Sequence, residues 1–151
     1  MANWRKNKVL MAVMVRNQEG LEKALADGRD VNMLGPSSMT PLHLAVLDAQ
    51  EKLVETLLAA GANLELRDKN DLTPLGYAVL PIIETPLPQH KKDLKTPEGQ
   101  ALLNASRARI RKQLLAAGAN WHIVSKKAPS PWERFEHYWP DLAQEMGRPA
   151  A

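Results

Sequence analysis

Cysteine is absent from this 151-residue sequence. The chain therefore forms neither disulfide bonds nor thiolate metal sites, and it has no catalytic Cys-His pair. No apolar run approaches the roughly 20 residues of a membrane-spanning helix. A short run, Val9 to Val15, follows three basic residues, but no small-residue cleavage site comes after it, so we expect no signal peptide. These absences predict a cytoplasmic protein that does not enter the membrane.

Recognisable catalytic and metal-binding motifs are also missing. The sequence contains no G-x-S-x-G, Walker A or G-x-G-x-x-G motif. No two histidines have the H-E-x-x-H spacing of a zinc-binding helix. We therefore expect no enzyme activity, no metal and no cofactor. The four scattered histidines are His43, His90, His122 and His137.

What the sequence does contain is an internal repeat. Thr40-Pro41-Leu42 recurs at Thr73-Pro74-Leu75, a spacing of about 33 residues. Further along, Leu57 to Asn63 recurs letter for letter at Leu114 to Asn120. The composition is otherwise that of an ordinary globular domain, with 44% hydrophobic and 25% charged residues. We assign residues 1–151 to a single domain.

Each repeat has the features of two short helices. Thr40 is suited to cap a helix, and Pro41 to its first position, where the missing N–H has no partner to lose. Apolar residues then recur at helical spacing as far as Leu58, and Gly61 stands where a left-handed residue ends the second helix. Two short helices do not bury their apolar faces alone, so neighbouring copies must complete the core.

The unit resembles the ankyrin repeat, whose period is about 33 residues and whose signature is T-P-L-H-x-A. Thr40 to Ala45 match every signature position, and Gly61-Ala62-Asn63 match the turn that closes such a unit. The resemblance implies an all-α solenoid of about four stacked helix pairs with projecting turns. It also implies that His43 ties adjacent turns together, whereas its counterpart Gly76 does not.

The register divides the chain into four units. Asn7 and Ser130 align with Thr40 as helix starts, and an insertion separates the two halves of the third unit. Beyond it, Thr96-Pro97-Glu98 predicts one lengthened second helix from about Pro97 to Ala117. We expect the C-terminal aromatic residues to fill the core of the last unit. The units are 7–39, 40–72, 73–129 with the insertion 81–104, and a C-terminal cap 130–147.

Positive charge is concentrated in the third unit. The net charge is +3, and the segment 81–117 carries the whole excess, which makes it a candidate contact for an acidic partner. The alternative is a solvated helix face. Nucleic acid is a less favoured partner, because the aromatic residues lie outside this segment and the net charge is modest. The candidate basic residues are Lys91, Lys92, Lys95, Arg107, Arg109, Arg111 and Lys112.

The family resemblance implies a function in binding other proteins, through the projecting turns, or fingers, and through the concave row of first helices. A short array of this kind is similar to bacterial immunity proteins, which bind and block a cognate toxin. A generic adaptor or inhibitor is the alternative. The register predicts exposed contact positions at Pro36, Ser37, Met39, Leu47, Asp48, Lys69, Asn70, Leu72, Leu80, Lys126, Lys127, His137 and Tyr138.

Overall fold

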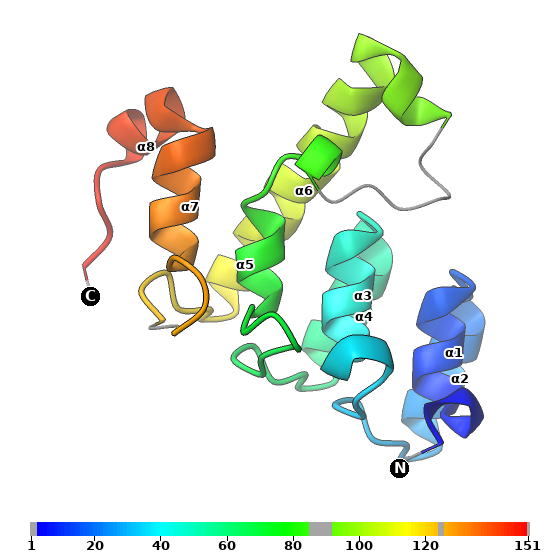
Figure 1. Cartoon of the computed structure of the whole chain (residues 1–151). Coiled ribbons are helices and arrows are strands. Elements are labelled where there is room, and N and C mark those ends of the chain that lie inside the picture. The colour runs from blue at the N-terminus through cyan, green and yellow to red at the C-terminus, as the bar shows by residue number, and fades with distance from the viewer. Residues whose placement is uncertain (1–2, 85–91, 124–125, 151) are drawn as a thin grey trace.

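The structure is a computed structural model that describes residues 3–84, 92–123 and 126–150. These residues form eight α-helices and no strand (Figure 1). This confirms the predicted all-α class. Short 3-10 turns occur at η1 (Trp4–Lys6), η2 (Pro36–Ser38), η3 (Ile82–Glu84) and η5 (Asp93–Lys95). The helices are α1 (Lys8–Met14), α2 (Gln18–Ala26), α3 (Pro41–Leu47), α4 (Glu51–Ala59), α5 (Pro74–Ala78), α6 (Pro97–Ala116), α7 (Pro131–Tyr138) and α8 (Pro140–Met146).

The first helix of each pair begins where the register predicts. Asn7, Thr40, Thr73 and Ser130 are the four N-caps, and each side-chain oxygen accepts a hydrogen bond from the backbone N–H three residues later. Such a cap satisfies one of the N–H groups that a helix start leaves without an internal partner. Local sequence alone therefore sets the starting points of the repeats.

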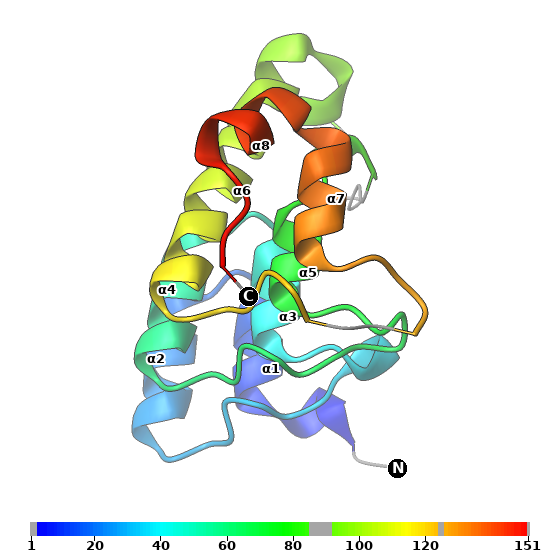
Figure 2. The same cartoon turned by 90° about the vertical axis from the view of Figure 1, so that its left-hand side faces the viewer.

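The second helices of the first three pairs end at glycines that adopt a left-handed backbone. Gly28, Gly61 and Gly118 have φ angles of 75°, 80° and 100°. Any other residue would be strained in this conformation. Just beyond α2, α4 and α6, where these glycines stand in the sequence, the chain leaves the second row and runs toward the first helices (Figure 2).

The pairs stack side by side in two rows. The first helices α1, α3, α5 and α7 pack in that order, and α2, α4 and α6 form the second row (Figures 1 and 2). The helix α6 has 20 residues, compared with 9 in α4, and this confirms the lengthened second helix of the third repeat. Residues 85–91 of the insertion, including Lys91, lie outside the described residues.

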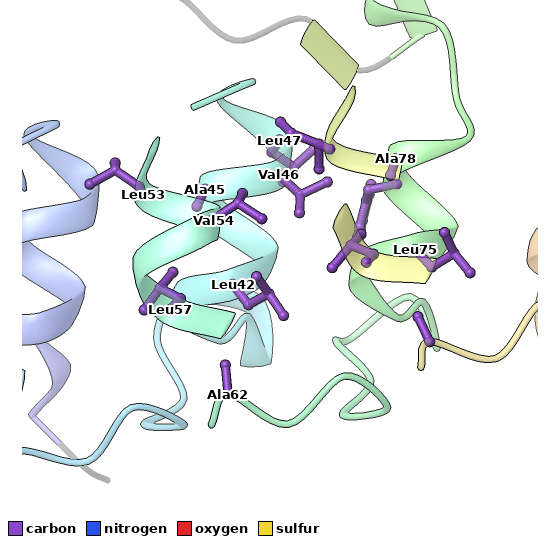
Figure 3. Close-up of a cluster of buried hydrophobic side chains, with 14 of the residues drawn as sticks. Leu42, Ala45, Val46, Leu47, Leu53, Val54, Leu57, Ala62, Leu75 and Ala78 are labelled. Atoms are coloured by element: carbon purple, nitrogen blue, oxygen red, sulfur yellow. The ribbon is translucent and has the colours of Figure 1, made fainter. Parts of the chain in front are cut away.

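The core is shared between neighbouring pairs (Figure 3). Leu42, Val46 and Leu57 of the second pair are buried together with Leu75 and Ala78 of the third. Because each helix pair leaves an apolar side for the next pair to cover, the repeats depend on one another for stability.

Aromatic residues fill the last unit, as predicted. Trp121, Trp132 and Phe135 are buried, with ring centroids 5.2 to 5.7 Å apart. Trp139 donates a hydrogen bond from Nε1 to the backbone oxygen of Val79 at 2.8 Å, which joins α7 and α8 to the third repeat. The C-terminal pair is therefore anchored by large rings.

We predict that Leu57→Ala and Leu114→Ala each reduce the free energy of unfolding by about 2 to 5 kcal/mol, because both leucines are fully buried. Leu102→Ala is the matched control, since Leu102 on α6 is 70% exposed; its effect should stay within about 0.5 kcal/mol, as should that of Lys69→Ala. Urea unfolding of the four variants measures the difference. Equal losses would contradict the packing of the two rows.

Candidate protein-binding surface

Three fingers project beyond the row of first helices, on the side opposite α2, α4 and α6 (Figure 2). We define them as residues 33–39, 67–72 and 126–130. The backbone N–H of Lys69 donates to the Ser37 oxygen at 2.8 Å, which joins the first two fingers. Lys126 N–H donates to the Asp71 carboxylate at 3.1 Å, which joins the second and third. These bonds hold the finger tips in register as one surface.

A buried carboxylate shapes the second finger. One oxygen of Asp68 accepts hydrogen bonds from the backbone N–H groups of Asn70 and Leu72, at 2.9 and 3.0 Å. The other oxygen accepts from the hydroxyl of Tyr77. Burial, and secondly this bond to Asp68, raise the pKa of Tyr77 to about 12. Tyr77 therefore stays neutral at physiological pH and keeps its proton for the carboxylate.

His43 ties the second finger to α3, as the family resemblance implies. Its Nε2 donates to the Leu72 carbonyl oxygen at 2.8 Å, because a carbonyl can only accept. Its Nδ1 consequently accepts from the backbone N–H and the hydroxyl of Thr40, at 3.1 and 2.9 Å. The ring is fully buried, and burial lowers its pKa. The neutral imidazole is the form that satisfies every bond.

The predicted contact positions fall into three groups. Four of them are buried rather than exposed: Leu47, Asp48, Leu72 and Leu80. The expected exposure was wrong there because Leu47 and Leu80 lie beneath the long helix α6, and because Asp48 pairs with Arg16 at 2.6 Å. Half-buried positions are Pro36, Met39 and Tyr138; exposed ones are Ser37, Lys69, Asn70, Lys126, Lys127 and His137.

A groove between the second and third fingers brings several of these positions together. Lys69 and Asn70 reach it from the second finger, and Lys127 from the third. The edges of Leu72 and Leu80 form part of its floor. The groove has a volume of about 510 Å³, and its remaining lining residues are Tyr77, Ala128 and Arg134.

Sequence reasoning missed Tyr77 and Arg134, although the register contained the signal. Each stands four residues after its capping residue, Thr73 or Ser130, so both occupy the same position of the first helix. Gly76 contributes in another way. A β-carbon at position 76 would lie 3.3 Å from Leu72 Cδ2. Because glycine has no β-carbon, the Leu72 side chain can pack at this place below the groove.

The predicted basic surface on α6 is wrong at two of its residues. Arg107 is 1% exposed, and its guanidinium donates to the backbone oxygens of Leu47 and Leu80 at 3.1 and 3.0 Å. Arg111 is also buried, with its guanidinium 4.7 Å from the centroid of the Phe135 ring. Burial lowers the pKa of Arg107 to about 10 and lowers that of Arg111. Both side chains face inward because α6 packs against α4 and α5.

The other basic residues of this set that the structure describes are exposed. Arg109 pairs with Glu51 of α4 at 2.8 Å, and this hydrogen bond is the main cause of the lowered pKa of Glu51. Lys92, Lys95 and Lys112 are exposed, and Lys91 is not among the described residues. An acidic partner would find less positive charge on α6 than the sequence indicates.

Neither a metal centre nor a membrane helix is present in the described ranges 3–84, 92–123 and 126–150. No three His, Asp or Glu side chains there gather closely enough to hold a metal ion. No helix in these ranges is both long and apolar enough to span a bilayer.

Comparison with known proteins identifies the family. Residues 9–85, just over half of the chain, match the family model described as ankyrin repeats (3 copies), so this protein belongs to the ankyrin-repeat family. The family is generally a non-catalytic module that mediates interactions between proteins. No curated protein matches the chain.

Solved structures share the fold, and 345 chains match it. One of these chains comes from the structure of a predatory endopeptidase from Bdellovibrio bacteriovorus in complex with an immunity protein, and it matches with a TM-score of 0.63 and 19% sequence identity. The match covers 93% of this protein, which spans 62% of the length of the matched chain. At such low identity the similarity establishes the fold.

We predict that Arg107→Met lowers the free energy of unfolding by about 2 kcal/mol. Methionine leaves two buried carbonyl groups without a donor, which costs about 1 to 3 kcal/mol each. Because the variant no longer buries a cation, part of this cost is offset by the smaller desolvation penalty. Arg109→Met is the control and should unfold close to the wild type, because its ion pair lies in solvent. Urea denaturation of both variants at one pH decides the matter. A milder effect at position 107 than at 109 would refute the role given to Arg107.

His43 should make stability depend on pH between about 7.5 and 5.5. Its folded-state pKa lies below the unfolded value near 6.5, so the unfolded chain takes up the proton first, and stability falls as the pH drops through 6.5. Uptake of one proton by the unfolded chain limits the slope to at most about 1.4 kcal/mol per pH unit. Chemical denaturation should show this slope in the wild type and a reduced slope in His43→Gln. The exposed His137→Gln variant is the control, and it must retain the wild-type slope.

Proposed function

We propose that this protein is a non-catalytic binding module that holds another protein with its three fingers and the row of first helices. The observation that carries the proposal is the hydrogen-bonded finger surface. Ser37, Lys69 and Lys126 stand at its exposed tips. A hydrogen bond between backbone groups links the first two fingers, and one from the Lys126 N–H to the Asp71 carboxylate links the second and third. A surface ordered before binding loses little conformational freedom when a partner docks, so its contacts contribute more fully to affinity.

The specific role that we propose is neutralisation of the bound partner, as an immunity protein neutralises a toxin. The similarity in fold to a chain from an endopeptidase–immunity protein complex supports this role. A rigid surface with an apolar floor and a charged rim also suits the blocking of a folded enzyme. An adaptor function is the second candidate, because ankyrin repeats mediate interactions between proteins in general.

Nucleic acid binding is a weaker alternative. It would depend on basic side chains along α6, yet Arg107 and Arg111 are buried and Arg109 is engaged with Glu51. The remaining exposed lysines on this segment do not alternate with exposed aromatic rings, which single-stranded nucleic acids would need for stacking.

Site-specific photo-crosslinking tests the proposed surface. A benzophenone amino acid is placed at Ser37, Lys69 or Lys126 on the fingers, and as controls at Lys52 or Glu55, which are exposed on α4. In lysate of the source organism we predict a protein adduct from the finger positions and none from α4. Adducts from α4 alone, or from all five positions equally, would contradict the assignment.

The purified partner then separates the two roles. Binding should weaken at least about tenfold in Asn70→Arg and stay unchanged in Glu55→Arg, because only Asn70 lies at a finger tip. If the partner is an enzyme or toxin and its activity is lost on binding, the protein neutralises it. A partner that remains fully active in the complex favours the adaptor.

A further inference from the structure

We propose that the groove between the second and third fingers receives an acidic segment of the partner protein, with carboxylates at its rim and an apolar side chain on its floor. This inference rests on the proposed function, since it names the chemistry that the same surface recognises. Three observations carry it: the charges that line the groove, the absence of acids among its lining residues, and its apolar base.

The positive charges converge from three separate elements. Lys69 comes from the second finger, Lys127 from the third, and Arg134 from α7. The lining residues include no aspartate or glutamate. Cations close together on a concave surface repel one another, so an anionic group placed between them is favoured by each of the three.

The acids beside the groove are already engaged. Asp71 of the second finger pairs with Arg67 at 3.3 Å and accepts a hydrogen bond from the Lys126 N–H. Asp68 is 7% exposed and accepts hydrogen bonds from two backbone N–H groups and from the Tyr77 hydroxyl. Tyr77 itself is uncharged at neutral pH, because burial and its bond to Asp68 raise its pKa to about 12. Because Arg67 balances the charge of Asp71, the three lining cations leave a net positive charge of two when Asp68 is counted against them.

The floor determines what accompanies the carboxylates. Leu72, Leu80 and Ala128 present apolar surface, and the Tyr77 ring lies beside them. An isolated anion would leave this surface in water, whereas an acidic segment with an apolar or aromatic residue covers it. The alternative contacts for an acidic segment are the exposed lysines of the α6 segment, Lys92, Lys95 and Lys112.

Two peptides test the groove without the natural partner. The first is acetyl-Glu-Leu-Asp-Trp-Glu-amide, and the second is its uncharged twin acetyl-Gln-Leu-Asn-Trp-Gln-amide. In titrations of the full chain followed by amide NMR, the acidic peptide should shift signals of Lys69, Asn70 and Lys127 at about millimolar concentration or below, and added salt should reduce the shifts. The twin should cause no comparable change.

Paired charge reversals provide the matched control. The double variant Lys69→Glu with Arg134→Glu should lower the affinity for the acidic peptide at least about tenfold. The control, Lys52→Glu with Lys112→Glu, changes the net charge by the same amount and should keep the affinity within about twofold of the wild type. The NMR spectrum also reports whether each variant is folded.

Several results would overturn the inference: equal shifts with both peptides, shifts centred on Lys92, Lys95 and Lys112, no shift at millimolar peptide, or tighter binding of a short DNA duplex in the groove. None of these results would contradict the crosslinking experiment, which tests the proposed function separately. If the fingers crosslink to a protein but the acidic peptide fails, only the groove chemistry is wrong. If the peptide binds but no finger adduct forms, only the proposed function is wrong.

Discussion

The fold depends on a buried guanidinium, that of Arg107. It lies at the ends of two first helices, where α3 and α5 leave the backbone oxygens of Leu47 and Leu80 without helical partners. A cation at a helix C-terminus interacts favourably with the partial negative charge there, and a planar guanidinium can serve two helix ends at once. Lysine would present a single ammonium centre and could not reproduce this geometry. Arg107 thereby joins the second repeat, the third repeat and the lengthened helix.

The lengthened helix explains how the array accommodates an insertion without losing its stack. From Pro97 to Ala116, α6 begins beyond its neighbours (Figure 1) and still delivers Ile110 and Leu114 into the shared core. Its inward face then carries two arginines, and each finds a partner other than a carboxylate: backbone oxygens for Arg107 and the Phe135 ring for Arg111. Buried cations remain acceptable when hydrogen bonds or an aromatic face replace water.

Buried hydrogen bonds also hold the second finger of the proposed binding surface in place. A histidine and a buried aspartate hold the second finger from opposite sides, through the Leu72 carbonyl and the Leu72 N–H. The same residue places its side chain at the floor of the groove. The order of the finger and the shape of the groove are therefore coupled, so a change at His43 or Asp68 would alter the proposed binding groove from within the protein.

The candidate site could be predicted only in part. The register located Lys69, Asn70 and Lys127, because finger tips follow directly from the repeat boundaries. Tyr77 and Arg134 stand 57 residues apart in the sequence (134 − 77), and only the stacking of α5 on α7 makes them neighbours of one groove. The burial of Leu47 and Asp48 likewise depends on α6 and on Arg16, which come from other repeats.

By itself, the sequence determined where each repeat begins and ends. Caps such as Thr40 and left-handed glycines such as Gly61 act within a few residues, through backbone angles and local hydrogen bonds, and so leave a readable pattern. Only the tertiary structure decided which face of α6 is buried. The insertion breaks the repeat, the position of the helix relative to its neighbours is then set by packing, and packing turned two of the expected surface arginines into parts of the interior.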